Sequence, residues 1–140
     1  MKKKKIIILS FFAIVIFTII CVIVGNKNIV EGTFINKNES TGKEEITEIK
    51  IIYKNDLPYE MILEVECEDK EVIDTSYEVM NEIVKTIKLL DSEDPTTLER
   101  DDNSFELRTT VESDAFTYVP KDISIREMKE YLSNEGWEVK

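Results

Sequence analysis

The stretch Tyr59 to Cys67, with the sequence YEMILEVEC, contains the clearest strand pattern in the chain. One face of the predicted strand carries the apolar side chains of Tyr59, Met61, Leu63, Val65 and Cys67. The opposite face carries Glu60, Glu64 and Glu66. Alternation of this kind is typical of an antiparallel sheet with one buried face and one face in water. The stretch therefore predicts an antiparallel sheet that is covered on one side only.

Further strands are expected on both sides of this stretch. Before it, residues 29–35 and 46–53 read as strands, joined by a polar turn over 36–45, and Asn55-Asp56-Leu57-Pro58 reads as the next turn. After it, residues 105–111 alternate again, and Glu112-Ser113-Asp114 is a turn that leads into a returning strand over 115–119. The polar, acidic segment 91–103 reads as a loop.

The hydrophobic period changes to that of a helix after residue 74. Thr75 and Glu78 have the spacing of a capping box, which predicts the start of the helix there. A buried helical stripe is predicted to contain Val79, Met80, Ile83, Val84, Ile87 and Leu90. Pro95 lies beyond the expected end of this helix.

The last helix is the best specified of the predicted elements. Ser124 and Glu127 have the spacing of a second capping box, and Ile123 and Met128 occupy the positions of a hydrophobic staple. Gly136 can adopt the left-handed conformation that ends a helix, which would bring the following tryptophan back onto the helix. Ile125, Met128 and Leu132 are expected to form the buried stripe of this helix.

These elements predict an α+β fold in the order β-β-β-α-β-β-α, with two helices packed on one face of an antiparallel sheet. A final short strand over residues 137–139 is an open alternative. The order of the strands within the sheet is not determined by the sequence.

The N-terminus predicts a membrane segment. Residues 6–24 form an apolar run without a charge, directly after the four lysines Lys2 to Lys5. At 1.5 Å per residue a helix of this length spans about 28 Å, close to the roughly 30 Å of the hydrocarbon core of a bilayer. The sequence thus predicts a cytoplasmic stub at 1–5, a transmembrane signal-anchor helix at 6–25 and an extracytoplasmic acidic domain at 26–140, because lysines stay on the cytoplasmic side.

Two other interpretations of this segment remain open. A cleaved secretory signal would have a shorter apolar run and a small-residue exit, whereas the best exit here is Ile23-Val24-Gly25. A lipoprotein signal would place a small residue before the modified cysteine, whereas Cys21 follows Ile20. A secreted or lipid-anchored form is therefore the lesser alternative to a single-pass protein of the cell membrane.

Charge and composition restrict the partners and the chemistry. The chain has a formal net charge of −11, and residues 26–140 hold 14 basic against all 29 acidic residues. Such a domain repels nucleic acid and anionic lipid headgroups. Histidine is absent, which removes the usual general base and the commonest metal ligand. Cys21 would lie in the membrane and Cys67 outside it, so no intrachain disulfide is expected.

A few residues are functional candidates by their chemistry. Cys67 ends the apolar face of its strand and is expected to be a buried thiol. Glu64 and Glu66 are expected to face solvent instead of performing acid/base chemistry. The acidic loop offers oxygen ligands without the glycine and the spacing of a calcium loop. Its members are Asp91, Glu93, Asp94, Asp101, Asp102 and Asn103.

We assign no catalytic, cofactor-binding or metal-binding residue from the sequence. It contains no phosphate-binding glycine loop, zinc pattern or serine-elbow motif. Asn38-Glu39-Ser40 would be a glycosylation acceptor only in a eukaryotic secretory route. The larger aromatic residues are expected mostly in the core: Tyr59, Phe105, Phe116, Tyr118 and Trp137.

The closing segment 124–132 (SIREMKEYL) and the following Asn134-Glu135-Gly136-Trp137 resemble the YehR-like small bacterial lipoproteins. The order of elements is similar over the whole external domain, and the last helix with its glycine-aromatic exit is similar in detail. The resemblance implies a membrane-tethered envelope protein of α+β fold and no catalytic residue. Members of that family carry a lipid-modified cysteine after a small residue, and Cys21 departs from this pattern.

The expected function is that of a non-enzymatic, membrane-anchored extracytoplasmic protein that interacts with another envelope or secreted protein. The alternative is a sensor or carrier domain that binds a small ligand or a cation between sheet and helices. An enzyme is the least favoured of the three classes.

Overall fold

A computed structural model describes residues 28–140, without the side chain of Tyr118. Its elements are β1 (Ile29–Lys37), β2 (Glu44–Lys54), β3 (Leu57–Cys67), α2 (Lys70–Leu90), β4 (Thr97–Arg100), β5 (Ser104–Thr110), η1 (Asp114–Tyr118), α3 (Ile125–Asn134) and β6 (Glu138–Val139). The predicted membrane segment 6–25, its orientation and Cys21 lie outside the described residues. Between residues 28 and 140, no helix is both long enough and apolar enough to span a bilayer.

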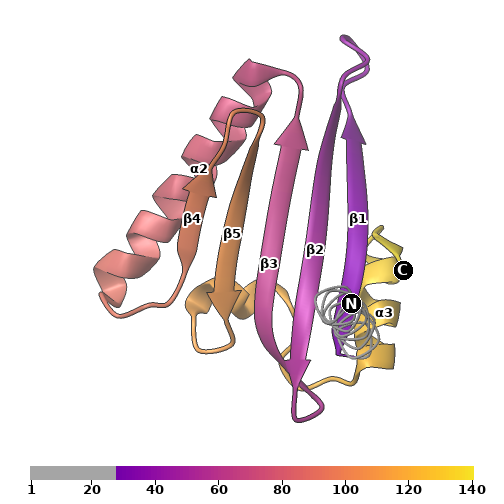
Figure 1. Cartoon of the computed structure of the whole chain (residues 1–140), viewed down its shortest axis with the longest axis vertical. Helices are drawn as coiled ribbons and strands as arrows, with labels where there is room; N and C mark the ends of the chain where they lie inside the picture. The colour runs from indigo at the N-terminus through magenta and orange to yellow at the C-terminus, as the bar shows by residue number, and fades with distance from the viewer. Residues whose placement is uncertain (1–27) are drawn as a thin grey trace, which may run out of the picture.

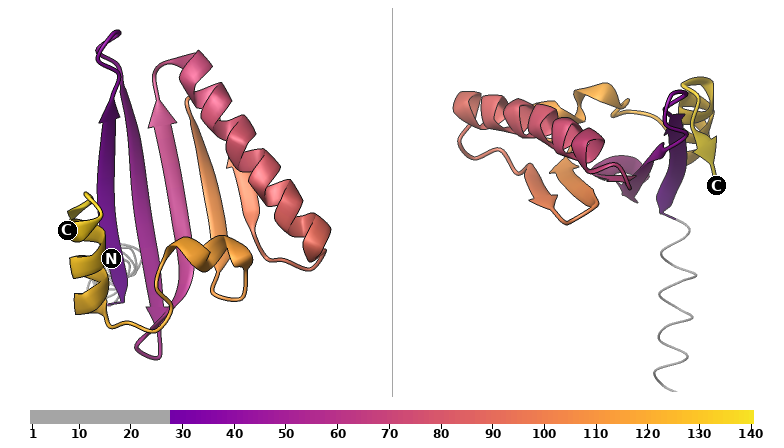
Figure 2. Two further views of the ribbon diagram at one scale, coloured as in Figure 1. Left: turned by 180° about the vertical axis from the view of Figure 1, so that it is seen from behind. Right: turned by 90° about the horizontal axis from the view of Figure 1, so that it is seen from above.

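The six strands form one sheet in the order β4-β5-β3-β2-β1-β6, and every neighbouring pair is antiparallel. Figure 1 shows α2 behind the β4–β5 side of this sheet and α3 behind β1. Seen from behind, α2, η1 and α3 all lie over one face of the sheet, here called the concave face (Figure 2). The prediction of an α+β fold with two helices on one side of an antiparallel sheet is therefore confirmed.

The core lies between this concave face and the helices. The inward side chains of the strands, including Val30, Ile51 and Leu107, are buried together with Met128 and Leu132 of α3. A second cluster joins Ile73 of α2 to the far ends of β3 and β5. The alternation that predicted β3 is confirmed at Met61, Val65 and Cys67, which are all buried.

Tyr59 was predicted on the inward face, and the structure shows this to be wrong. Asn55 and Asp56 have φ values of 53° and 63°, so the β2–β3 hairpin has a tight two-residue turn. Ile52 pairs with Glu60 and Tyr53 with Pro58, which leaves Tyr59 as the extra residue of a bulge. Its side chain is 42% exposed, and the Lys54 ammonium lies 4.9 Å from the ring centroid.

The predicted start of the first helix is also wrong. α2 begins at Lys70, and its N-cap is Asp69, whose carboxylate accepts hydrogen bonds from the backbone N–H groups of Glu71 and Val72. Thr75 lies inside the helix, where its hydroxyl donates to the Glu71 carbonyl at 2.8 Å. The helix therefore begins more than one turn earlier than the sequence predicted.

The predicted stripe of α2 is correct only in part. Val84 is buried, whereas Val79 and Leu90 are 58% and 80% exposed. The added first turn places Ile73 at the sheet instead, where it is fully buried. Because α2 lies over the β4–β5 side of the sheet, only a narrow stripe of the helix meets it (Figure 2).

Two segments have a different secondary structure from the one predicted. The expected loop 91–103 contains β4, which pairs with β5 and is tied to α2 by an ion pair of 2.6 Å between Arg100 and Asp74. The expected strand over 115–119 is the 3₁₀ helix η1 and the residue after it. Ser113 caps η1 by accepting a hydrogen bond from the Ala115 N–H, and Phe116 is fully buried.

The predictions for the last helix are confirmed. The Ser124 hydroxyl accepts from the Glu127 N–H, and the Glu127 carboxylate accepts from the Ser124 N–H. Gly136 has a φ of 92°, and the Trp137 N–H donates to the Leu132 carbonyl at 2.9 Å. Residues 138–139 form the short strand β6, which pairs with Gly32 and Thr33 of β1.

Candidate functional site

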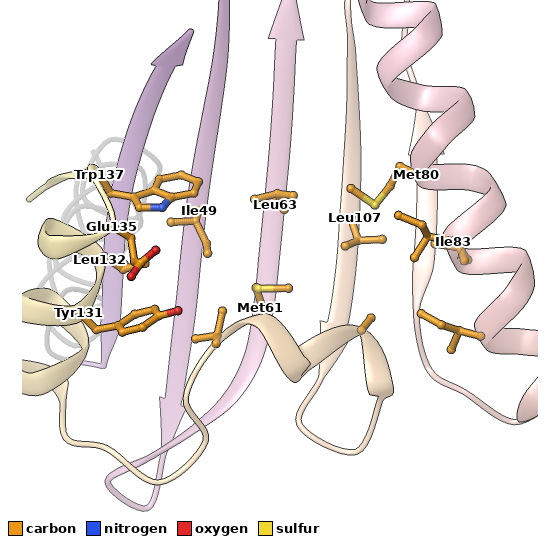
Figure 3. A pocket seen from close by; sticks show the side chains of 14 residues that line it. Ile49, Met61, Leu63, Met80, Ile83, Leu107, Tyr131, Leu132, Glu135 and Trp137 are labelled. Carbon is orange, nitrogen blue, oxygen red and sulfur yellow. The ribbon is translucent and has the colours of Figure 1, made fainter.

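An apolar groove of about 350 Å³ lies between α2 and α3 on the concave face of the sheet. The strands contribute Ile49, Met61, Leu63 and Leu107, and η1 with the residue after it contributes Ala115 and Val119. Figure 3 shows the α2 and α3 side chains facing each other across these residues. The groove exists because the two helices lie on the same face of the sheet but near its two opposite edges. They leave the centre of that face partly uncovered (Figure 2).

The strand register accounts for the sheet side of the groove. Ile49 of β2 lies opposite Leu63 of β3, and Leu63 lies opposite Leu107 of β5. Antiparallel pairing places directly opposed residues on the same face. A continuous apolar row therefore crosses the three central strands, and Leu63 is its midpoint.

Helix α2 contributes Met80, Ile83, Val84 and Ile87, which recur at helical spacing. The sequence placed these residues in the core. Val84 is buried, but Ile83 remains 37% exposed because the groove in front of it is open. This side of the groove therefore offers aliphatic and thioether surface and no charge.

Helix α3 contributes Tyr131, Leu132 and Glu135, and Trp137 follows from the helix exit. The helix ends in a pair of hydrogen bonds, from Gly136 N–H to the Ser133 carbonyl and from Trp137 N–H to the Leu132 carbonyl. Such an ending returns the chain over the last turn. The indole then packs at 5.7 Å, centroid to centroid, from the ring of Phe34.

Tyr131 and Glu135 are the polar residues among those that line the groove. Their side chains point from α3 toward the groove, with the indole of Trp137 on the other side of the carboxylate in the view of Figure 3. They are four positions apart, at the end of α3, so they lie on one face. The groove therefore has an apolar α2 side and a partly polar α3 side.

The acidic candidates of the sequence are not brought together. Asp91, Glu93 and Asp94 precede β4, whereas Asp101, Asp102 and Asn103 follow it at the opposite end of the strand. The carboxylates of Asp91 and Asp101 accept hydrogen bonds from backbone N–H groups within their own turns. Within residues 28–140, no group of three or more Asp, Glu or Cys side chains is arranged to hold a metal ion.

Glu64 and Glu66 lie on the convex face, away from the groove. Glu64 lies directly opposite Glu48 on one side and Glu106 on the other, and Glu106 lies opposite Glu99. These four residues form a row across the sheet, here named the glutamate row. Arg108 is near it, with 3.3 Å between its guanidinium and the Glu106 carboxylate.

Cys67 is 3% exposed and free, as expected for a buried thiol. Of the aromatic candidates, Phe105 and Phe116 are buried as predicted, and Trp137 is half-buried at the groove. The core interpretation is therefore correct for the two phenylalanines and incomplete for the tryptophan.

A buried polar cluster lies below the end of α2. The Thr96 hydroxyl is 2.8 Å from the hydroxyls of both Thr109 and Ser113, and the Thr96 N–H donates to the Asp94 carboxylate at 2.8 Å. Burial alone would raise the pKa of Asp94, but hydrogen bonds from Thr96 and Ser113 and the charge of Lys88 hold this pKa below its ordinary value. The cluster fastens the α2–β4 connection to β5.

The groove itself was missed by the sequence analysis, because an apolar residue on an amphipathic helix looks the same whether it meets a partner or an opening. One signal was available: Tyr131, directly before Leu132, and Glu135, three positions after it, place two polar groups beside the inward stripe of α3, and Trp137 follows the helix. The chain matches no family model, no curated protein and no solved structure. The resemblance to the YehR-like lipoproteins stays a prediction.

Proposed function

We propose that residues 28–140 form a domain that binds an apolar small molecule in the groove between α2 and α3. The observation that carries the proposal is the groove itself: about 350 Å³, apolar on the sheet and on α2, with two polar side chains on α3. Ligand sites are typically concave, between about 300 and 1,000 Å³, and mostly apolar with a few polar groups. A ligand would supply the contacts that Leu63 and Ile83 lack.

We propose further that this domain is held outside the cytoplasm by the N-terminal segment, as a sensor or carrier at the membrane. The apolar run at 6–24 and the lysines before it support this location. A non-enzymatic role is supported by the absence of histidine from the sequence. It is also supported by the hydrogen-bonding of the buried hydroxyls of Thr96, Thr109 and Ser113 to one another.

The test uses the full chain in phosphatidylcholine nanodiscs, with Trp137 as the reporter. Trp137 is the single tryptophan of the chain and lines the groove. Titration with the neutral, compact alcohol 1-adamantanol should shift the emission of Trp137 in a saturable manner. A strictly linear response, as partition into lipid would give, contradicts the proposal.

Two variants of α2 locate the binding. Ile83→Gln places a polar group in the groove and should weaken binding by about fivefold, since it removes one buried aliphatic contact. Val79→Gln is the matched control, because Val79 lies one turn earlier, is 58% exposed and is outside the groove. Equal weakening by both variants would place the ligand elsewhere.

A second candidate function is the binding of a protein partner in the envelope. The observation that favours it is the adjacent pair Leu89 and Leu90, which are 86% and 80% exposed at the end of α2. Crosslinking in intact membranes should then yield a product that Leu89→Ser/Leu90→Ser abolishes and Val79→Ser retains. Crosslinked products that are the same for all three proteins would exclude this site.

A further inference from the structure

We propose that the ligand of the groove is an amphipathic organic cation, with its apolar body over Leu63 and its ammonium head beside Glu135 and Trp137. This inference rests on the proposed function and adds the charge and the orientation of the ligand. Three features of the α3 side of the groove support it: the charge of Glu135, the end of the helix, and the aromatic rings.

The first feature is an unbalanced negative charge. Among the described residues that line the groove, Glu135 carries the one full charge, and neither a lysine nor an arginine is present. The Glu135 side chain is directed toward the groove in Figure 3. No ion pair with a basic side chain is found for Glu135 within residues 28–140. A cationic head would supply this missing partner.

The second feature is the position of Glu135 at the C-cap of α3. The C-terminal end of a helix carries a partial negative charge, which basic residues in the last turn usually balance. The last turn of α3 contains none. The carboxylate and the helix end therefore add their negative potentials at the same end of the groove, which favours a cation and disfavours an anion.

The third feature is the pair of aromatic side chains on either side of the carboxylate. Tyr131 and Trp137 both line the groove, and in the view of Figure 3 the Glu135 oxygens lie between the phenol and the indole. The faces of such rings attract organic cations, and Trp attracts them most strongly. A carboxylate flanked by two rings is a suitable environment for an alkylammonium group.

The opposite side of the groove sets the orientation of the ligand. Met80, Ile83 and Ile87 of α2 offer a surface on which a charged head would lose water without gaining a partner. The apolar body would therefore lie over Leu63 toward α2, with the head at α3. Residues 26–140 hold 14 basic against 29 acidic residues, and this excess also draws a cation toward the domain.

The experiment compares three probes that share one apolar cage and differ in the head: protonated 1-aminoadamantane, 1-adamantanol and 1-adamantanecarboxylate. Each is titrated into the full chain in phosphatidylcholine nanodiscs at neutral pH, with Trp137 emission as the readout. The cation should bind about fivefold more tightly than the alcohol, and the carboxylate more weakly than both. Glu135→Gln should reduce the preference of the cation over the alcohol to below about twofold, and this preference is a ratio of two affinities measured on the same protein.

Glu130→Gln is the matched control, because it removes one exposed carboxylate of α3 that does not line the groove. Lipid partition is the same for each probe in all proteins and cancels when the variants are compared. Equal affinity for cation and alcohol overturns the cation proposal and leaves the proposed function standing. A preference that survives Glu135→Gln, or that Glu130→Gln also removes, overturns it too. Failure of all three probes to saturate overturns the proposed function itself.

Discussion

Trp137 packs against the backbone of Gly32. A Cβ atom on Gly32 would lie 3.4 Å from Trp137 Cβ and 3.5 Å from its Cε3, and 3.3 Å from a methyl group of Ile49. The absent side chain of Gly32 thus provides the space in which the indole lies over β1 at the edge of the groove. One glycine on the sheet and one tryptophan after α3 together define that end of the groove.

Replacing this glycine should displace the tryptophan. Gly32→Val adds three carbon atoms where even a Cβ is crowded, so we expect a loss of about 1 to 3 kcal/mol in the free energy of unfolding and a red shift of Trp137 emission. Urea denaturation followed by fluorescence measures both. Thr33→Val, on the opposite face of β1, is the control, and an equal loss there would show that the effect comes from the strand and not from the indole.

The start of α2 can be tested by two substitutions. Asp69→Ala removes the N-cap and should cost about 1 kcal/mol, whereas Thr75→Ala should change the stability by less than about 0.5 kcal/mol. Thermal and urea denaturation give the values. Lys43→Gln removes the 3.5 Å ion pair to Asp69 and separates its small contribution from that of the cap. A larger loss for Thr75→Ala than for Asp69→Ala would contradict the observed start.

Asp94 should make the stability of the domain depend on pH in the acidic range. Its pKa lies below the ordinary value of 3.8, so the folded state favours the carboxylate; this contribution is present above that value and is lost as the pH falls through the folded pKa. Asp94→Asn should therefore cost about 1 to 2 kcal/mol at pH 7 and progressively less below the ordinary value. Denaturation across this range, with the exposed Glu93→Gln as control, measures it. A constant difference at every pH would argue against the assignment.

Tyr53 should make the stability of the domain depend on pH in the alkaline range. Burial, together with the charge of Glu127, raises the pKa of Tyr53 from 10.0 to about 12. The neutral phenol donates to the carbonyls of Ile123 and Ser124 at 3.0 and 3.1 Å, so its contribution is complete below pH 10 and is lost between about pH 10 and 12.

Tyr53→Phe removes both the hydrogen bonds and this titration. We expect a loss of about 1 kcal/mol at neutral pH and a shallower decline of stability above pH 10 than in the unchanged chain. Tyr59→Phe is the matched control, because Tyr59 is 42% exposed. If both variants follow the same alkaline profile, the buried phenol is not responsible for the decline.

Local sequence patterns predicted the elements that depend on contacts between residues close together in the sequence. Alternation predicted β3, and the capping residues Ser124 and Glu127 with Gly136 predicted both ends of α3, because these contacts span at most five positions. Thr75 misled because its spacing to Glu78 imitates a cap, whereas the side chain bonds back to the Glu71 carbonyl inside an established helix.

Elements held by distant partners could not be predicted. β4 has four residues and exists through its pairing with β5 and the bond from Arg100 to Asp74, which is 26 positions away. In η1, Ala115 and Phe116 are adjacent and both buried, a pattern that excludes a half-buried strand only once the core is known. The groove depends on how far apart two helices lie over a sheet, and no single segment encodes that distance.

The glutamate row has a consequence for the dependence of the fold on ionic strength. Like charges directly opposite each other on a sheet oppose its formation, and Glu48, Glu64 and Glu106 meet in this way across three neighbouring strands. Dissolved salt screens such repulsion over distances of about 10 Å at 0.1 M. The domain should therefore melt at a higher temperature as sodium chloride is added. Proteins whose stability depends on surface ion pairs should show the opposite trend.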